Sequence, residues 1–154
     1  MTNHTRFFSL ALAALVLSIS SAEAISDKYK SVSDNLTADA EQVLLQGKAE
    51  EADRLLNLAL TANPGNAKAF VLKGQAQRKL DNKDEGLRLI GVGLDIEPGD
   101  QKALKLQGDA ALDVGNLELA EKALNRLRTV CAAPCEAAND LSAALEKSRS
   151  AKKD

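Results

Sequence analysis

Small and apolar residues recur along most of the chain at intervals of three and four, which is the period of an amphipathic helix. In the segment EAANDLSAALEKS, for example, Ala138, Leu141 and Leu145 fall on one helical face. No segment shows the alternation of β-branched residues that is typical of a strand. The pattern predicts helices over residues 35–46, 49–62, 67–80, 83–96, 101–114, 117–131 and 136–148.

The same pattern returns every 34 residues. When residues 67–100 are aligned with residues 101–134, equivalent positions carry the same or similar side chains, and a shift in the other direction reveals a third copy. A fixed period of this length predicts stacked repeats, each made of one supersecondary unit. The matched pairs include Lys68 with Lys102, Gly74 with Gly108, Asn82 with Asn116, and Pro64 with Pro98.

Each repeat carries the signals of a helical hairpin. Gly47 and Gly115 stand where the first helix must end, because glycine readily adopts the left-handed conformation of a helix stop, and Asp81 takes the equivalent place. Asn82 and Asn116 then suit the N-cap of the second helix. The sequences NPGN and EPGD end that helix, because proline cannot continue it.

This spacing resembles the tetratricopeptide repeat family, although aliphatic residues replace the family's aromatics almost throughout. In the middle repeat the family positions are occupied by Phe70, Gly74, Gly86, Ile90, Gly93 and Pro98. The resemblance covers about residues 35–134. It implies an all-α, right-handed solenoid of three helical hairpins at about 33–66, 67–100 and 101–134, closed by a capping helix at 136–148.

The N-terminus has the pattern of a secretory signal. A polar start is followed by the apolar run FFSLALAALVLS and a small-residue site, in which Ala22 and Ala24 predict cleavage before Ile25. The apolar run is too short for a membrane helix, which needs about 20 residues. We therefore expect a signal peptide at 1–24, a flexible mature N-terminus at 25–34, a basic tail at 149–154, and a periplasmic or secreted protein with no membrane span after cleavage.

Charge and composition argue against several functions. The net charge of −2 indicates neither nucleic acid nor an anionic membrane as partner. His4 is the only histidine and lies in the predicted signal, so the mature chain has no Ser/His or Cys/His pair for nucleophilic catalysis. We expect a protein that is not an enzyme and has no cofactor or metal site.

The resemblance implies a binding module instead, because in this family the first helices of successive repeats line a concave groove. Some family members hold chaperone C-termini with a clamp of Lys and Asn residues, but only Lys102 matches those positions. The lysines of the expected groove suit a protein or peptide partner with acidic or carboxylate groups, unless they form an ordinary solvated helix face. The candidates are Lys68, Val71, Gln75, Arg78, Lys102, Lys105, Asp109 and Leu112, with Leu72, Leu106, Thr37, Glu41 and Leu44 beside them.

Cys131 and Cys135 lie where the third repeat meets the capping helix. An exported protein enters an oxidising compartment, and Pro134 disfavours helix at Ala133, so we predict a disulfide at this turn. A redox pair or a two-thiolate Cu(I) site is the alternative. The sequence thus favours an exported scaffold or adaptor for protein–protein interaction, with a thiol-based redox or Cu(I)-carrier protein as the second hypothesis.

Overall fold

The computed structural model describes residues 26–151, and within this range every element is a helix. The all-α class is therefore confirmed, and the ends of α2 to α6 agree with the predicted ranges to within one residue. The first helix is described over residues 26–45, and it is followed by α2 (Ala49–Ala62), α3 (Ala67–Lys79), α4 (Lys83–Ile96), α5 (Gln101–Asp113), α6 (Leu117–Val130) and α7 (Glu136–Ala151).

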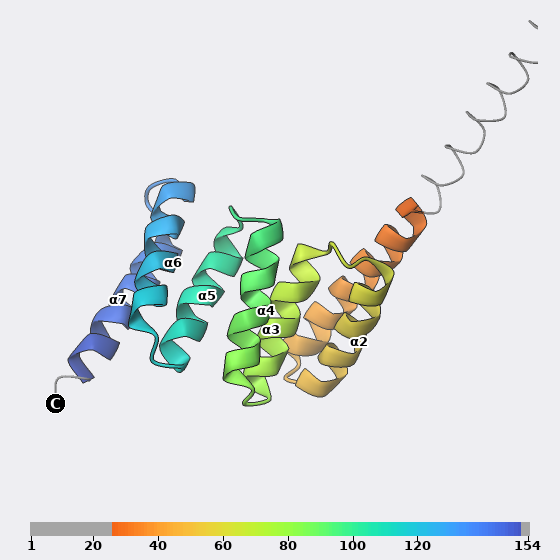
Figure 1. The fold of residues 1–154 in the computed structure, drawn as a ribbon, viewed down its shortest axis with the longest axis horizontal. Coiled ribbons are helices and arrows are strands. Elements are labelled where there is room, and N and C mark those ends of the chain that lie inside the picture. The colour runs from red at the N-terminus through yellow and green to blue at the C-terminus, as the bar shows by residue number, and fades with distance from the viewer. Residues whose placement is uncertain (1–25, 152–154) are drawn as a thin grey trace, which may run out of the picture.

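The helices pair into antiparallel hairpins that stack in a row from the N-terminal to the C-terminal end (Figure 1). α3 packs on α4 and α5 on α6, and each hairpin also contacts the next, since α2 packs on α3 and α4 on α5. α7 packs on both α5 and α6 at the end of the row, as expected of a capping helix. The predicted solenoid of helical hairpins is confirmed.

The N-terminal helix differs from the prediction. Residues 26–34 are helical, so the expected flexible segment at 25–34 is wrong over that range. Residues 26–32 are exposed and continue a helix that is anchored to the stack from Ser33 onward. The anchor is a contact distant in sequence: the side-chain amide of Asn66, just before α3, donates to the Oγ of Ser33 at 2.9 Å and to the Oγ1 of Thr37 at 3.1 Å. Ser33 and Thr37 are both buried.

The predicted ends of the chain fall largely outside the described residues. The proposed signal peptide at 1–24 lies outside them, as does the end of the proposed basic tail at 152–154. The start of that tail, at 149–151, belongs to α7, which extends three residues beyond the predicted 148. Within residues 26–151, no helix has the length and hydrophobicity needed to cross a bilayer.

The turns inside the hairpins follow the repeat. Gly47, Asp81 and Gly115, spaced 34 residues apart, have φ angles of 80°, 65° and 72°, so all three adopt the left-handed conformation that the sequence predicts. Asn116 caps α6 by accepting from the backbone N–H of Leu119. Asn82 does not cap α4, which corrects the prediction, because its side-chain amide instead donates to Gln77 at 2.8 Å.

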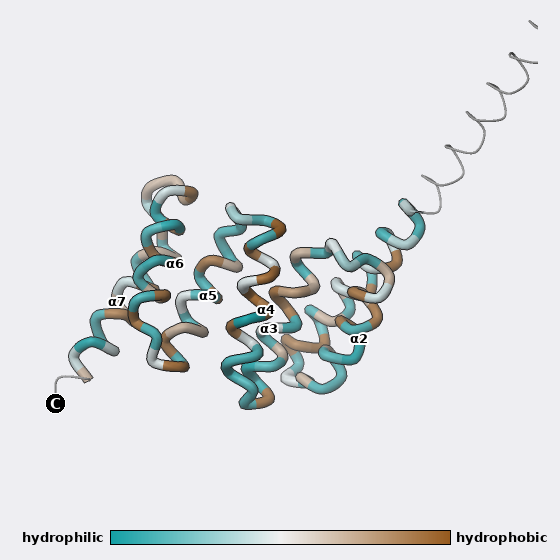
Figure 2. The backbone as a smooth tube through the Cα atoms, in the orientation of Figure 1, coloured by the Kyte–Doolittle hydropathy of each residue, from teal (hydrophilic) through white to brown (hydrophobic). Residues whose placement is uncertain are grey.

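Amphipathic helices build the core, and Figure 2 shows hydrophobic and hydrophilic stretches alternating along each of them. Small residues let the helices approach closely: a Cβ atom added to Gly74 of α3 would lie 2.6 Å from the carbonyl oxygen of Gly86 in α4. The buried residues form two clusters, one around Leu56 and one around Ile90 and Leu104. α3 contributes to both clusters and so connects the first hairpin to the rest of the stack.

Candidate functional site

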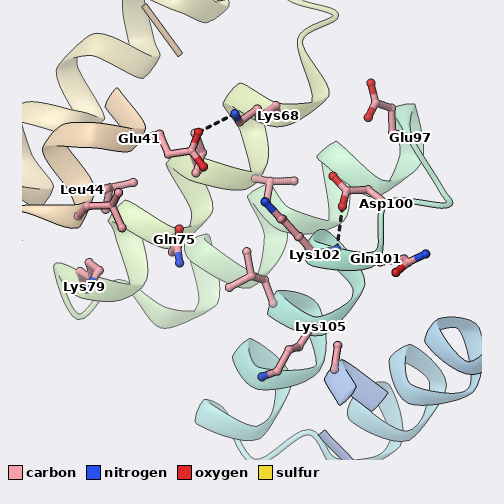
Figure 3. Close-up of a pocket in the computed structure, with 15 residues that line it drawn as sticks. Glu41, Leu44, Lys68, Gln75, Lys79, Glu97, Asp100, Gln101, Lys102 and Lys105 are labelled. Atoms are coloured by element: carbon pink, nitrogen blue, oxygen red, sulfur yellow. Dashed lines mark hydrogen bonds and ion pairs between the residues drawn. The ribbon is translucent and has the colours of Figure 1, made fainter. Parts of the chain in front are cut away.

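The first helices of the three hairpins line a groove of about 800 Å³ (Figure 3). Its walls come from the helix at 26–45, from α3 and from α5, and Ala137 at the start of α7 closes one side. Five of the predicted binding residues lie in this groove, namely Lys68, Val71, Gln75, Lys102 and Lys105, together with the neighbouring candidates Glu41, Leu44, Leu72 and Leu106.

The floor of the groove is apolar. Leu44, Val71 and Leu72 are between 5% and 7% exposed, so they present only a small part of their surface to the cavity. Leu45 is different, because this large side chain lines the same groove and is 78% exposed. Leu106 on α5 is partly buried and borders the groove on the other side. The groove therefore offers aliphatic surface to a ligand at Leu45 and Leu106.

The groove is less positively charged than its predicted lysines suggest. Lys68 lies 2.6 Å from a carboxylate oxygen of Glu41, and Lys105 lies 2.8 Å from one of Asp109. These two lysines are therefore neutralised by acids of the protein itself. Among residues 26–151, Lys79 and Lys102 are the lysines of the groove without an ion pair.

Lys102 is placed to meet a ligand. Figure 3 shows its side chain extending from α5 toward α3 across the groove, whereas Glu97 lies at the far edge. The carboxylate of Asp100 is occupied in capping α5, where it accepts from the backbone N–H groups of Lys102 and Ala103 at 2.8 and 3.1 Å. The side chain of Lys102 is thus a cation over the cavity, with no ion pair within the described part of the chain.

Three predicted binding residues lie outside the groove lining. The guanidinium of Arg78 donates from Nε and Nη2 to one oxygen of Asp113, at 3.0 and 2.6 Å, and so links α3 to the end of α5. Asp109 acts as the partner of Lys105. Leu112 instead lines a smaller hollow of about 310 Å³ beside the end of α7. Thr37, also expected to face the groove, is buried.

Six residues of the groove lining were not predicted from the sequence, namely Glu97, Asp100, Gln101, Ala137, Leu45 and Lys79. Two of these, Leu45 and Lys79, are related by the repeat. They lie 34 residues apart, so they occupy the same position in successive repeats. The repeat period could therefore have found both of them together. The repeat period does not identify Ala137, because this residue reaches the groove through the packing of α7 on α5.

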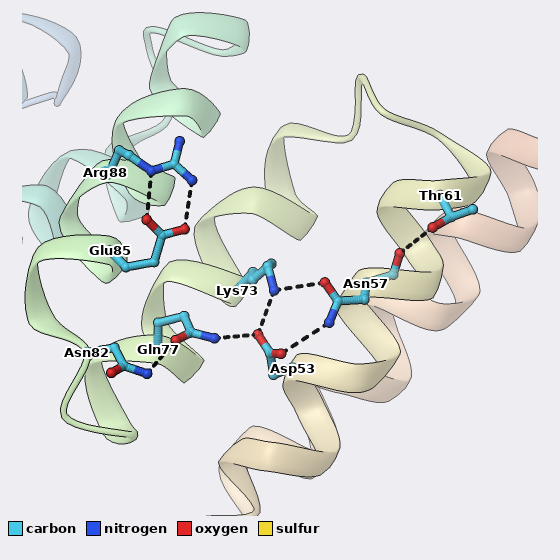
Figure 4. A network of polar contacts seen from close by, with 8 residues as sticks. All are labelled: Asp53, Asn57, Thr61, Lys73, Gln77, Asn82, Glu85 and Arg88. Atoms are coloured by element: carbon cyan, nitrogen blue, oxygen red, sulfur yellow. Dashed lines mark hydrogen bonds and ion pairs between the residues drawn. The ribbon is translucent and has the colours of Figure 1, made fainter.

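A polar network joins the first and second hairpins outside the groove (Figure 4). Asp53 of α2 accepts from Lys73 at 2.7 Å and from Gln77 at 2.8 Å, both on α3, and from Asn57 at 3.1 Å. Partial burial by itself raises the pKa of Asp53, but the hydrogen bonds from Lys73 and Gln77, the charge of Lys73 and the hydrogen bond from Asn57 together outweigh it and lower the pKa below its ordinary value. The network is a link between hairpins.

The predicted disulfide is present. Cys131 and Cys135 are bonded, with their Cα atoms 5.8 Å apart, and the Ala133–Pro134 peptide bond between them is cis. Cys131 is also the C-cap of α6, and both cysteines pack against the larger core cluster. The bond therefore spans the corner between α6 and α7. Within residues 26–151, no three His, Cys, Asp or Glu residues are grouped closely enough to hold a metal ion.

Comparison of the sequence with protein-family models and with curated proteins gives no match. Solved structures do resemble the chain. The first TPR of Spaghetti (RPAP3), bound to the HSP90 peptide SRMEEVD, is 21% identical, with a TM-score of 0.70 over 81% of this chain and 98% of that one. The Yersinia enterocolitica type III secretion chaperone SycD, in complex with a peptide of the translocator YopD, is 18% identical, with a TM-score of 0.68 over 77% and 93%. The TPR2B domain of yeast Sti1, in a complex with pHsp70, is 15% identical, with a TM-score of 0.70 over 77% and 96%.

Proposed function

We propose that this chain, which has the fold of tetratricopeptide repeat domains, is an exported adaptor that holds a segment of a partner protein in its groove. The observation that carries the proposal is the groove itself, because three adjacent helices and α7 enclose about 800 Å³ with an apolar floor and a polar rim. Cavities of this size and lining are typical of ligand sites.

The structural neighbours support a peptide as the ligand. Two of the similar domains are bound to peptides, from HSP90 and from YopD. The proposal assigns no catalytic activity to the chain, since its only histidine, His4, lies in the predicted signal. Its role is to bring proteins together.

Filling the groove tests the binding part of the proposal. In Gln75→Trp, the indole would occupy space between α3 and its neighbours, so we expect loss of partner binding with no change in the circular dichroism spectrum. The matched control is Leu58→Trp, because Leu58 is 57% exposed on α2 and does not line the groove. Binding is compared by quantitative mass spectrometry of proteins captured by each variant. Equal capture of the same partners by Gln75→Trp and the wild type would refute the groove as the binding site.

Export is tested separately, by the N-terminus of the protein recovered from cells. The signal pattern predicts a mature chain that begins at Ile25 and is found in the periplasmic or secreted fraction. An intact mass that includes residues 1–24, in protein confined to the cytosol, would contradict export while leaving the groove proposal standing.

A further inference from the structure

We infer that the groove binds an internal segment with a large apolar side chain flanked by isolated carboxylates, and requires neither a strongly acidic segment nor a free chain end. This inference rests on the proposed function and specifies the partner's chemistry. The apolar side chain would pack on Leu45 and Leu106, and single carboxylates would meet Lys102 and Lys79.

The apolar part of the inference follows from Leu45. Burial of a leucine side chain is favourable, and Leu45 is 78% exposed in a concave site, so a ligand that covers it would gain that free energy. Leu106 and the exposed edges of Val71 and Leu72 extend the same floor. Contiguous exposed apolar surface that is framed by polar residues marks interaction sites.

The preference for isolated carboxylates follows from the ion pairs that two of the groove lysines already form. A strongly acidic ligand would have to compete with Glu41 for Lys68 and with Asp109 for Lys105, at N···O distances of 2.6 and 2.8 Å. A ligand that displaced either acid would leave that carboxylate without its partner, so little net attraction would result. The groove therefore offers two separate cations, Lys79 and Lys102, and no cluster of positive charge.

The positions of these two lysines place the carboxylates on either side of the apolar contact. Figure 3 shows Lys79 beside Leu44 on the first-hairpin side, and Lys102 across the groove on α5. The apolar lining residues come from the same elements, with Leu45 on the first helix, Val71 and Leu72 on α3 and Leu106 on α5. A free C-terminal carboxylate is not required, because each lysine ammonium is a point charge that can pair with a side-chain carboxylate.

A library of synthetic dodecapeptides with acetylated and amidated ends tests the inference with the mature chain, residues 25–154. We expect the enriched peptides to share one large aliphatic or aromatic residue with an Asp or Glu on one or both sides. Their Kd, measured by fluorescence anisotropy, should change by less than about threefold between 50 and 200 mM NaCl, because only one or two exposed ion pairs form.

Substitutions of groove residues, each with a control outside the groove, test which side chains contact the peptide. Leu45→Ser should weaken binding of an enriched peptide about tenfold, whereas Leu58→Ser should not, because Leu58 is an exposed leucine outside the groove. Lys102→Gln should weaken it roughly two- to fivefold, and Lys122→Gln, on the exposed face of α6, should not. Replacing the peptide's acidic residue by its amide should remove the effect of Lys102→Gln.

The outcomes separate this inference from the proposed function. Enrichment of polyacidic peptides, or binding that tightens about tenfold or more when an enriched peptide is synthesised with a free C-terminal carboxylate, would overturn the inference; if Gln75→Trp abolishes that binding, the groove stays the binding site. If no peptide shows binding that Gln75→Trp abolishes, both the inference and the proposed function are overturned.

Discussion

At the scale of the residue, backbone conformation separates positions that look alike in the sequence. Asp81 takes the place of Gly47 and Gly115 and has a positive φ of 65°. Left-handed backbone costs an L-residue about 1–2 kcal/mol, although Asp tolerates it better than most residues. Its ion pair with Lys83, at 3.5 Å and highly exposed, offers little compensation.

Substitutions at these turns should therefore change the free energy of unfolding in opposite directions. We expect Asp81→Gly to stabilise the protein by about 0.5 kcal/mol and Gly115→Ala to destabilise it by about 1 kcal/mol, as measured by urea unfolding. Gly99→Ala is the control, because Gly99 has equally open surroundings but no positive φ, and it should be neutral or slightly stabilising. A loss of stability in Asp81→Gly would contradict this explanation.

Side-chain hydrogen bonds were harder to predict from the sequence than backbone conformation. The helix stops at Gly47, Asp81 and Gly115 could be predicted because their conformation depends on the local sequence. The Asn82 cap was wrong because a nearby acceptor, Gln77, competes for that side chain. The pairing of Asp53 could not be predicted either, since its partners lie 20 and 24 residues away, on another helix.

Asp53 predicts a dependence of stability on pH. A carboxyl group whose pKa is lowered on folding contributes stability above its unfolded pKa, near 3.8, and that stability is lost as the pH falls through the folded pKa. The wild type should be more stable than Asp53→Asn by about 1–2 kcal/mol at pH 7, and the difference should shrink below about pH 4. Asp39→Asn, at an exposed position, serves as the control. A difference that stays constant from pH 7 to pH 3 would refute the ionic contribution.

At the scale of the element, helical periodicity located α2 to α6 because each of them buries one apolar stripe. It missed residues 26–34, which have few apolar residues at helical spacing and continue a helix that is anchored by the contact of Asn66 with Ser33. Local pattern therefore predicts a helix well when its own side chains form the core, and poorly when another segment holds it in place.

The capping helix illustrates the role of the disulfide. α7 is held by Leu141 and Leu145 in the larger core cluster and by the bond between Cys131 and Cys135 at its start. In the chain-entropy account, a ring of this size contributes about 2 kcal/mol. The bond should therefore act chiefly on α7.

The double variant Cys131→Ser/Cys135→Ser should lose about 2 kcal/mol of stability. Amide hydrogen exchange should accelerate most in α7, while the interface of α3 and α4 stays protected. Wild-type protein treated with reductant should behave like the variant. Uniform acceleration along the whole chain would contradict a local role for the bond.

At the scale of the whole molecule, the stacking of hairpins creates the groove, and the repeat register predicted much of its lining. Residues 34 apart share a position, so Lys68 and Lys102 could both be assigned to the groove side. The net charge of the groove could not be predicted, because the pair of Lys68 with Glu41 connects different hairpins, as does the pair of Arg78 with Asp113 outside the groove lining. Such pairs depend on how the hairpins are packed, which the period alone does not specify.

Site-specific photocrosslinking shows whether the partner protein lies in the groove. A benzoylphenylalanine at Gln75, in the groove, should crosslink a partner protein in cells that express the full-length chain. The same group at Leu58, exposed on α2 outside the groove, should give little or no adduct. Adducts of equal yield at the two positions, or adducts at Leu58 alone, would contradict the account.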